Sequence, residues 1–168
     1  MAAKRQVVIF KIGGEEFAAD IMDTKEVLVM RGITPVPETD SYVEGVMNLR
    51  GNLVPVLDLR KRLGASGSCD SPDRRIIVAN LDGRLVGLIV DGASEVIRVG
   101  EEMIEPVPDM IVEMGVGYIT GIINLQERFI TLIDLRKALT EEITGDLDEV
   151  TRLLSMRDGA ATRARAIL

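Results

Sequence analysis

The chain has 168 residues, of which 46% are hydrophobic and only 3% aromatic, and its formal net charge at pH 7 is −7. That length allows one core of ordinary size, or two small cores that share an interface. The negative charge argues against nucleic acid as a partner, because phosphate-backbone affinity comes from clustered lysine and arginine. No stretch approaches the roughly 20 apolar residues of a membrane span, so we expect no direct membrane insertion.

The histidine and cysteine content narrows the chemistry further. The sequence has no histidine, which removes the commonest general base and metal ligand. The single cysteine, Cys69, cannot form an internal disulfide and lies in a Gly/Ser-rich stretch, where a tolerated loop thiol is the simplest interpretation. The N-terminus lacks the apolar centre of a secretory signal. These features indicate a cytoplasmic protein, and we expect no metal, no cofactor and no catalytic residue.

The first elements along the chain have the spacing of β-strands. An apolar run from Val7 to Ile12, two glycines and a second run from Phe17 to Met22 predict a hairpin. A third strand is predicted at Glu26 to Arg31. The segment Pro35-Val36-Pro37 then ends the pairing, because proline cannot join a central strand ladder.

A second hairpin is predicted from Val46 to Arg50 and from Leu53 to Leu57. Asp58 follows it and precedes a short Leu-Arg-Lys stretch. A carboxylate in that position most simply caps the helical turn that comes next. Residues 65–73, rich in glycine, serine and proline, predict a linker between two halves of the chain.

The same order of elements returns in the second half, which indicates an internal duplication. Residues 42–64 and 118–140 carry the same residue at nine aligned positions, including Gly45 with Gly121 and Asp58 with Asp134. The second set of predicted elements is a hairpin at Ile76 to Leu81 and Leu85 to Val90, a strand at Glu95 to Val99, a break at Pro106 to Pro108, and a hairpin at Ile122 to Leu125 and Phe129 to Ile133.

Five short strands in each half predict a small barrel, since closure removes exposed sheet edges. We therefore predict one barrel at about residues 7–64 and a second at about residues 74–140. Several strands are apolar on both faces, which suggests that the barrels pack on each other. In residues 143–168 a capping box at Asp146 and Glu149 precedes Leu147, Val150 and Leu154, which predicts a C-terminal helix with a frayed tail.

Residues 5–142 carry an ordered set of motifs, including FKIGGEEFAADI, GVMNLRGNLVPVLDLR, LVGLIVDGASEV and LIDLRKAL. This set resembles the CheW-like coupling proteins of chemotaxis. The resemblance implies an all-β fold with short helices, built as two five-stranded SH3-like barrels around a shared core. It also implies a non-enzymatic adaptor that joins the cytoplasmic tip of a chemoreceptor to the regulatory domain of the histidine kinase CheA. Such an adaptor is cytoplasmic and is recruited to membrane-associated receptor arrays.

The resemblance also assigns a receptor-binding site. It consists of the NLRG motif, Asn48, Leu49, Arg50 and Gly51, together with Glu26, which is expected to pair with Arg50. Such a pair would hold the arginine fork in place and so fix the local surface. An alternative is that the pair is purely structural, and the two roles are compatible.

The sequence departs from the family at Thr24, where an apolar residue is usual, and the second repeat has Gln126 and Glu127 in place of Arg-Gly. Two other functions stay open. One is coupling in a CheA-like pathway that does not control flagella. The other is an enzyme that uses carboxylates such as Glu15, Glu16, Asp20 and Asp82, although these lie in turn-rich segments typical of a solvated surface.

Overall fold

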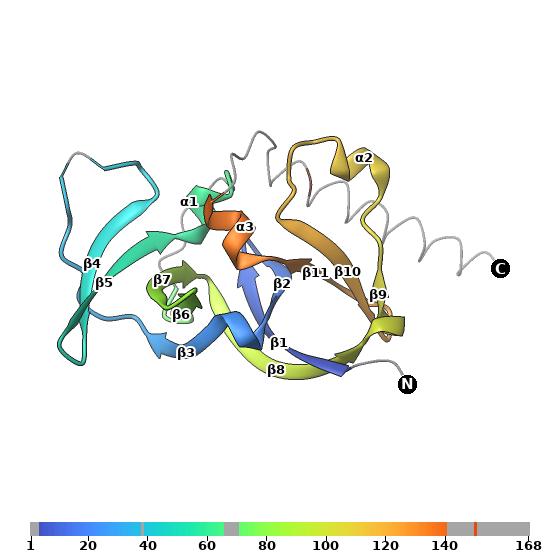
Figure 1. Ribbon diagram of the computed structural model, residues 1–168, viewed down its shortest axis with the longest axis horizontal. Coiled ribbons are helices and arrows are strands. Elements are labelled where there is room, and N and C mark those ends of the chain that lie inside the picture. The colour runs from blue at the N-terminus through green and yellow to red at the C-terminus, as the bar shows by residue number, and fades with distance from the viewer. Residues whose placement is uncertain (1–3, 38, 66–70, 141–149, 151–168) are drawn as a thin grey trace.

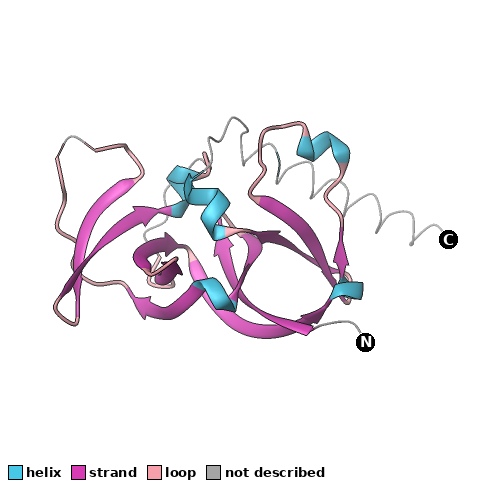
Figure 2. Ribbon diagram, in the orientation of Figure 1, coloured by secondary structure: helices cyan, strands magenta, loops and turns pink. Residues whose placement is uncertain are grey.

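The computed structural model describes residues 4–37, 39–65 and 71–140, together with Val150. Strands dominate this part of the chain, and the helices are all short (Figure 2). The predicted all-β fold with short helices is therefore confirmed.

The first repeat contains the predicted strands and the predicted helical turn. They are β1 (Lys4–Ile12), β2 (Glu15–Asp20), β3 (Thr24–Val29), β4 (Val43–Leu49), β5 (Asn52–Asp58) and α1 (Leu59–Arg62). The 3₁₀ turn η1 (Ile21–Asp23) was not predicted, and it ends β2 before Met22, where the strand was expected to end. The Asp58 carboxylate accepts a hydrogen bond from the Lys61 backbone N–H at 3.3 Å, so the predicted N-cap of α1 is confirmed.

The second repeat has the same plan with three additions. It contains β6 (Arg75–Leu81), β7 (Arg84–Val90), β8 (Gly92–Gly100), β10 (Ile119–Leu125), β11 (Arg128–Ile133) and α3 (Leu135–Thr140). The additions are η2 (Glu101–Met103), β9 (Ile104–Glu105) and α2 (Asp109–Val112), none of which the sequence reading placed. Asp134 aligns with Asp58, which predicts the same capping role, and its carboxylate accepts the Lys137 N–H of α3 at 3.1 Å.

The strands form two sheets, and each sheet combines strands of both repeats (Figure 1). One has the order β8-β1-β2-β11-β10-β9 and the other the order β3-β6-β7-β5-β4. The first hairpin of each repeat has moved into the sheet of the other repeat, where β2 pairs in parallel with β11 and β7 with β5. The assignment of one barrel to residues 7–64 and the other to residues 74–140 therefore needs correction, as does the count of five strands for the first sheet.

In both sheets one continuous stretch of chain joins the two edges. The edge strand β8 runs through η2 into β9, which pairs with β10 at the opposite edge. In the other sheet the chain after β3 reaches Thr34, which pairs with Val46 of the far edge strand β4. The Thr34 bridge and β9 are thus the same closing device in the two repeats, and each sheet curls towards a barrel.

Three apolar clusters hold the fold together. One lies within the first sheet, around Ile9 and Ile130, and one within the second, around Val56 and Ile76. The largest lies between the sheets and includes Phe10, Phe17, Ile77 and Leu88 together with residues of α1 and α3. This cluster confirms that the sheets share a core. Val150 is helical and fully buried in it, whereas the rest of the predicted C-terminal helix lies outside the described residues.

Candidate functional site

The turn between β4 and β5 fixes the NLRG motif in one conformation. Arg50 and Gly51 both have positive φ, 51° and 88°, as a type I′ hairpin turn requires. The Asn48 side-chain oxygen accepts the Gly51 backbone N–H at 2.8 Å, and Leu49 is buried in the core of the sheet. Three of the four motif residues therefore shape the turn, and the fourth, Arg50, projects from it with 66% of its side chain exposed.

Arg50 and Glu26 form the ion pair that the resemblance implied. The two terminal nitrogens of the guanidinium donate to the two carboxylate oxygens at 2.8 and 2.9 Å. This bidentate bond lowers the pKa of the Glu26 carboxyl and raises the pKa of Arg50. Glu26 belongs to β3 and Arg50 follows β4, so the pair spans the two edges of the second sheet. All five predicted site residues thus meet at one place.

Exposed apolar side chains lie on β3, which carries Glu26, and on the equivalent strand of the second repeat. On β3 the side chains alternate between partly buried and exposed, and Val27 and Val29 are 41% and 64% exposed. On β8, the equivalent strand of the second repeat, Val96 is 51% exposed. Figure 1 shows β3 and β8 along the lower side of the molecule. We call Val27, Val29 and Val96 the lower apolar strip.

Two further apolar areas lie at the far ends of the molecule. On the β4–β5 hairpin Leu53 is 74% exposed, and Pro55 is also exposed on the same strand. At the opposite end Met110 and Val112 of α2 are 65% and 59% exposed (Figure 1). Sequence reasoning missed α2, although Pro108 and Tyr118 are farther apart than Pro37 and Tyr42, which signals an insertion in the second repeat.

In the second repeat, one arginine near the corresponding turn binds two glutamates. Sequence reasoning missed this group, which we call the Arg128 cluster. Arg128 at the start of β11 donates through Nε to Glu16 and through a terminal nitrogen to Glu95, both at 2.8 Å. The bond to Arg128 lowers the pKa of the Glu16 carboxyl. Gln126 and Glu127 form the equivalent turn of the second repeat. Their φ values are also positive, 49° and 69°, as those of Arg50 and Gly51 are in the first repeat.

Three of the four carboxylates proposed for an enzyme pair with different arginines. Glu16 pairs with Arg128, Asp20 with Arg5 at 3.3 Å, and Asp82 with Arg136, whose nitrogen lies 2.6 Å from a carboxylate oxygen. Within the described ranges no group of three or more histidine, cysteine, aspartate or glutamate side chains is placed to hold a metal ion. None of the described helices is long and apolar enough to cross a membrane.

Two curled sheets, each combining strands of both repeats, define a duplicated β-sheet protein with several exposed apolar areas. A family model described as the CheW-like domain matches residues 6–156, so the chain belongs to the CheW-like family, and the match extends past the boundary of 142 expected from the motifs.

Curated relatives and a solved structure agree with this assignment. The chain is 34% identical to the chemotaxis protein CheW of Klebsiella aerogenes over 148 residues, which cover 88% of this chain and 89% of the relative. It is 33% identical to that of Rhizobium meliloti, over 82% of this chain and 89% of the relative. The crystal structure of the scaffolding protein TtCheW from Thermoanaerobacter tengcongensis superposes with a TM-score of 0.75 at 36% identity, covering 82% of this chain and 94% of that one. The chain is therefore an adaptor of chemotaxis signalling.

Proposed function

We propose that this adaptor joins the cytoplasmic tip of a chemoreceptor to the regulatory domain of the histidine kinase CheA, and that it does so without catalysis. The observation that carries the proposal is the Arg50–Glu26 pair, which presents an exposed guanidinium in a fixed position. A flexible surface arginine would lose conformational entropy on binding, whereas this one is already ordered.

The proposed receptor surface combines this pair with the lower apolar strip. Val27 and Val29 leave β3 on the opposite face from Glu26, so the receptor helix would lie across the edge that this strand forms. A receptor tip is a helical hairpin, and an amphipathic helix docks through apolar side chains at intervals of three and four residues. Val27, Val29 and Val96 supply apolar contacts for such a helix. Arg50 and Glu26 add a polar contact that fixes its register, while Asn48, Leu49 and Gly51 keep the turn in shape.

The proposed kinase surfaces are the two apolar ends. Leu53 lies at one end of the long axis and Met110 with Val112 at the other, and the two areas differ in shape and sequence. Contacts between unlike surfaces at opposite ends generate rings when the rotation closes. In the resemblance CheA's regulatory domain has the same double-barrel fold, so its barrel ends are the natural counterparts of these two areas.

Each contact of this kind is small, and strength comes from repetition in the array at the membrane. A signalling effect also requires unequal affinity for two states of the array, because an adaptor that binds both equally shifts nothing. The protein is thus expected in the cytoplasm, with recruitment through the receptor tips.

Co-sedimentation with a receptor cytoplasmic fragment and the CheA regulatory domain tests the proposal. We expect the unmodified protein to enter a ternary complex, and Arg50→Ala to lose receptor binding while keeping CheA binding. The matched control is Arg84→Ala, an exposed arginine that follows another glycine-containing hairpin turn. Equal receptor binding by Arg50→Ala and Arg84→Ala would reject the site, and failure of the unmodified protein to bind either partner would reject the function.

A further inference from the structure

The end of the molecule that carries α2 is acidic as well as apolar. The apolar side chains of Met110 and Val112 are exposed there, and so are the carboxylates of Asp109 and Glu113. We call these four residues the α2 end. Asp109 and Glu113 are four positions apart in a helical turn, so they share one face, on which like charges repel. Within the described ranges neither carboxylate belongs to an ion pair.

The chain around α2 supplies no positive charge. Residues 99–127, which contain η2, β9, α2 and β10, carry six carboxylate side chains and neither lysine nor arginine. The aligned stretch of the first repeat, residues 30–51, contains Arg31 and Arg50. The two repeats therefore differ in charge at the ends that they form.

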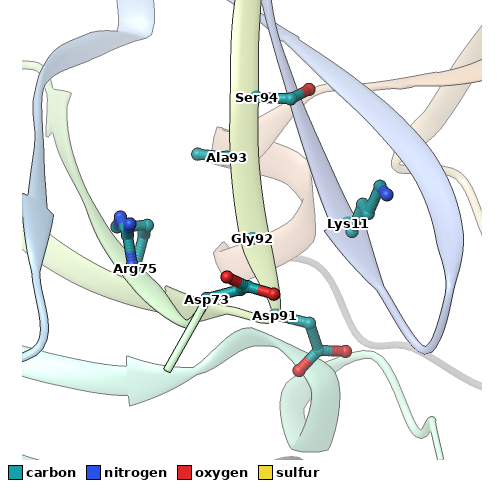
Figure 3. A pocket seen from close by; sticks show the side chains of 7 residues that line it. All are labelled: Lys11, Asp73, Arg75, Asp91, Gly92, Ala93 and Ser94. Carbon is teal, nitrogen blue, oxygen red and sulfur yellow. The ribbon is translucent and has the colours of Figure 1, made fainter. Parts of the chain in front are cut away.

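Carboxylates in other parts of the structure have cations beside them. In the hollow where β1, β6 and β8 meet, Lys11 and Arg75 lie on either side of β8 (Figure 3). Asp91, which precedes β8, pairs there with the buried Arg60. The α2 end lacks such a cation among the described residues, so it fits an occupant that brings both positive charge and apolar side chains.

The sequence itself contains a segment with this chemistry. Residues 151–168, which lie outside the described ranges, carry four arginines and one aspartate, although the whole chain has a net charge of −7. Within them, residues 159–168 have two arginines, no carboxylate side chain and the apolar pair Ile167 and Leu168. We call residues 159–168 the basic tail. An arginine fork matches a carboxylate, and the isoleucine and leucine match the exposed apolar side chains of α2.

Val150 brings the basic tail within reach of the α2 end. It is fully buried in the apolar cluster that also contains Ile111, the buried residue of α2. The 13 residues from 151 to 163 span at most about 45 Å. A tether of this length gives an effective concentration on the order of millimolar, so contacts that are weak individually are sufficient.

We propose that the basic tail folds back onto the α2 end of the same molecule and covers it. Arg163 and Arg165 pair with Asp109 and Glu113, while the apolar residues of the tail pack on α2. The consequence rests on the proposed function, in which the α2 end binds the kinase regulatory domain. The tail then competes with the kinase, and the apparent affinity falls in proportion to the fraction of molecules in which the α2 end is open.

Paramagnetic broadening of backbone amide signals in the full chain tests the contact. A nitroxide spin label is attached at Ala161→Cys in a Cys69→Ser background. We expect it to broaden the amides of residues 109–113 and to leave those of Asn52 and Leu53, at the other end of the molecule, unchanged. The broadening should weaken as the ionic strength rises from about 0.05 to 0.5 M, because salt screens exposed charges.

Matched variants show whether charge holds the tail in place. Arg163→Gln/Arg165→Gln and Asp109→Asn/Glu113→Gln should each abolish the broadening, whereas Arg163→Lys/Arg165→Lys should keep it. Asp73→Asn, a change at an exposed carboxylate elsewhere, should also keep it. Unbroadened α2 amides in the unmodified tail, or equal broadening in Arg163→Gln/Arg165→Gln, would overturn the proposal.

A mixed sample separates a contact within one molecule from a contact between two. It combines isotope-labelled protein without a nitroxide and spin-labelled protein without isotopes. We expect no broadening at residues 109–113 in this mixture. Broadening there would assign the tail to the α2 end of a second copy and would overturn the intramolecular contact.

Binding of the CheA regulatory domain tests the competition. Arg163→Gln/Arg165→Gln should bind it about threefold or more tightly than the unmodified chain, because the α2 end is then always open. Arg84→Gln, at an exposed arginine on β7, should bind like the unmodified chain. Equal affinity of the tail variant and the unmodified chain would overturn the competition. Absence of binding by both would count against the proposed function, while the broadening experiment still decides the tail contact.

Discussion

The two repeats carry a glutamate at the same aligned position, but each glutamate pairs with an arginine from a different position. Glu26 in the first repeat and Glu95 in the second occupy aligned positions on β3 and β8. Glu26 is held by Arg50, which lies in the turn and is 66% exposed. Glu95 is held by Arg128, which lies after the turn, is 38% exposed and also binds Glu16.

Under the proposed function, that difference separates a surface for partners from a structural clamp. Both terminal nitrogens of Arg50 bind one carboxylate, and the arginine side chain remains accessible to a partner. Arg128 divides its fork between two strands, so it ties β11 to both β2 and β8 and offers less to a partner. We therefore propose that the duplicated scaffold uses one turn for recognition and the equivalent region of the other copy for stability.

The largest difference between the repeats is expected at the aligned glycines of β4 and β10. In Gly45→Ala the new Cβ would lie 2.0 Å from the Thr34 carbonyl oxygen, and φ is 143°, a region that favours glycine. In Gly121→Ala the closest atom belongs to the side chain of Ile104, at 2.7 Å, which can rotate away. We expect Gly45→Ala to cost about 3 kcal/mol or more and Gly121→Ala about half as much, measured by denaturant unfolding. Equal losses of unfolding free energy in the two variants would show that the closing segments of both repeats accommodate the added methyl group equally well.

Removal of the two arginines should have opposite effects on stability and binding. Arg128→Ala should lower the free energy of unfolding by about 1 kcal/mol, because three strands lose a shared partner and two carboxylates are left facing each other. Arg50→Ala should leave the unfolding midpoint near that of the unmodified chain, because the pair is solvent-exposed, but should weaken receptor binding. Denaturant unfolding beside co-sedimentation checks both, and a reversed pattern would contradict the division of roles.

The contribution of Arg128 should depend on pH. The folded-state pKa of Glu16 lies below its ordinary value of 4.5. The associated stability is therefore fully present above that value and is lost as the pH falls through the folded-state pKa. We expect the stability difference between the unmodified chain and Arg128→Ala to be constant near neutral pH and to narrow below about pH 4.5. A difference that persists unchanged in acid would mean that Arg128 acts through packing instead.

The smallest expected effects come from the two helix caps. Asp58→Ala and Asp134→Ala each remove one bond to an N–H of the first helical turn. We expect losses of about 0.5 kcal/mol, somewhat larger for Asp134 because its bond is shorter and α3 is longer than α1. Asn at either position should restore most of the loss, whereas Ala and Asn variants of equal stability would exclude capping.

The features that sequence predicted are the local ones. Gly13-Gly14 and Asp82-Gly83 marked hairpins, and Asp58 and Asp134 marked helix starts, because turns and caps depend on residues a few positions apart. The pairing of Glu26 with Arg50 came from the family motif and was confirmed by the geometry.

The features that sequence missed depend on distant contacts. Nothing near β1 or β2 says that this hairpin pairs with β8 and β11, because both candidate sheets offer equally apolar partners. The Arg128 cluster was missed for the same reason, since Glu16 is far away in the chain and becomes a neighbour only through the β2–β11 pairing. Gln126 aligns with Arg50, so the alignment of the repeats gives no sign that the arginine two positions later binds the equivalent glutamate.

The exchange of hairpins has a consequence for how the chain folds as it is synthesised. All strands of the second sheet exist once Val90 has been made, whereas the first sheet lacks its last strand until Ile133. At about 5–20 residues per second, the N-terminal hairpin waits several seconds for its partners. The first segment to leave the ribosome is thus among the last to be paired, and its exposed edges are the natural target for a chaperone.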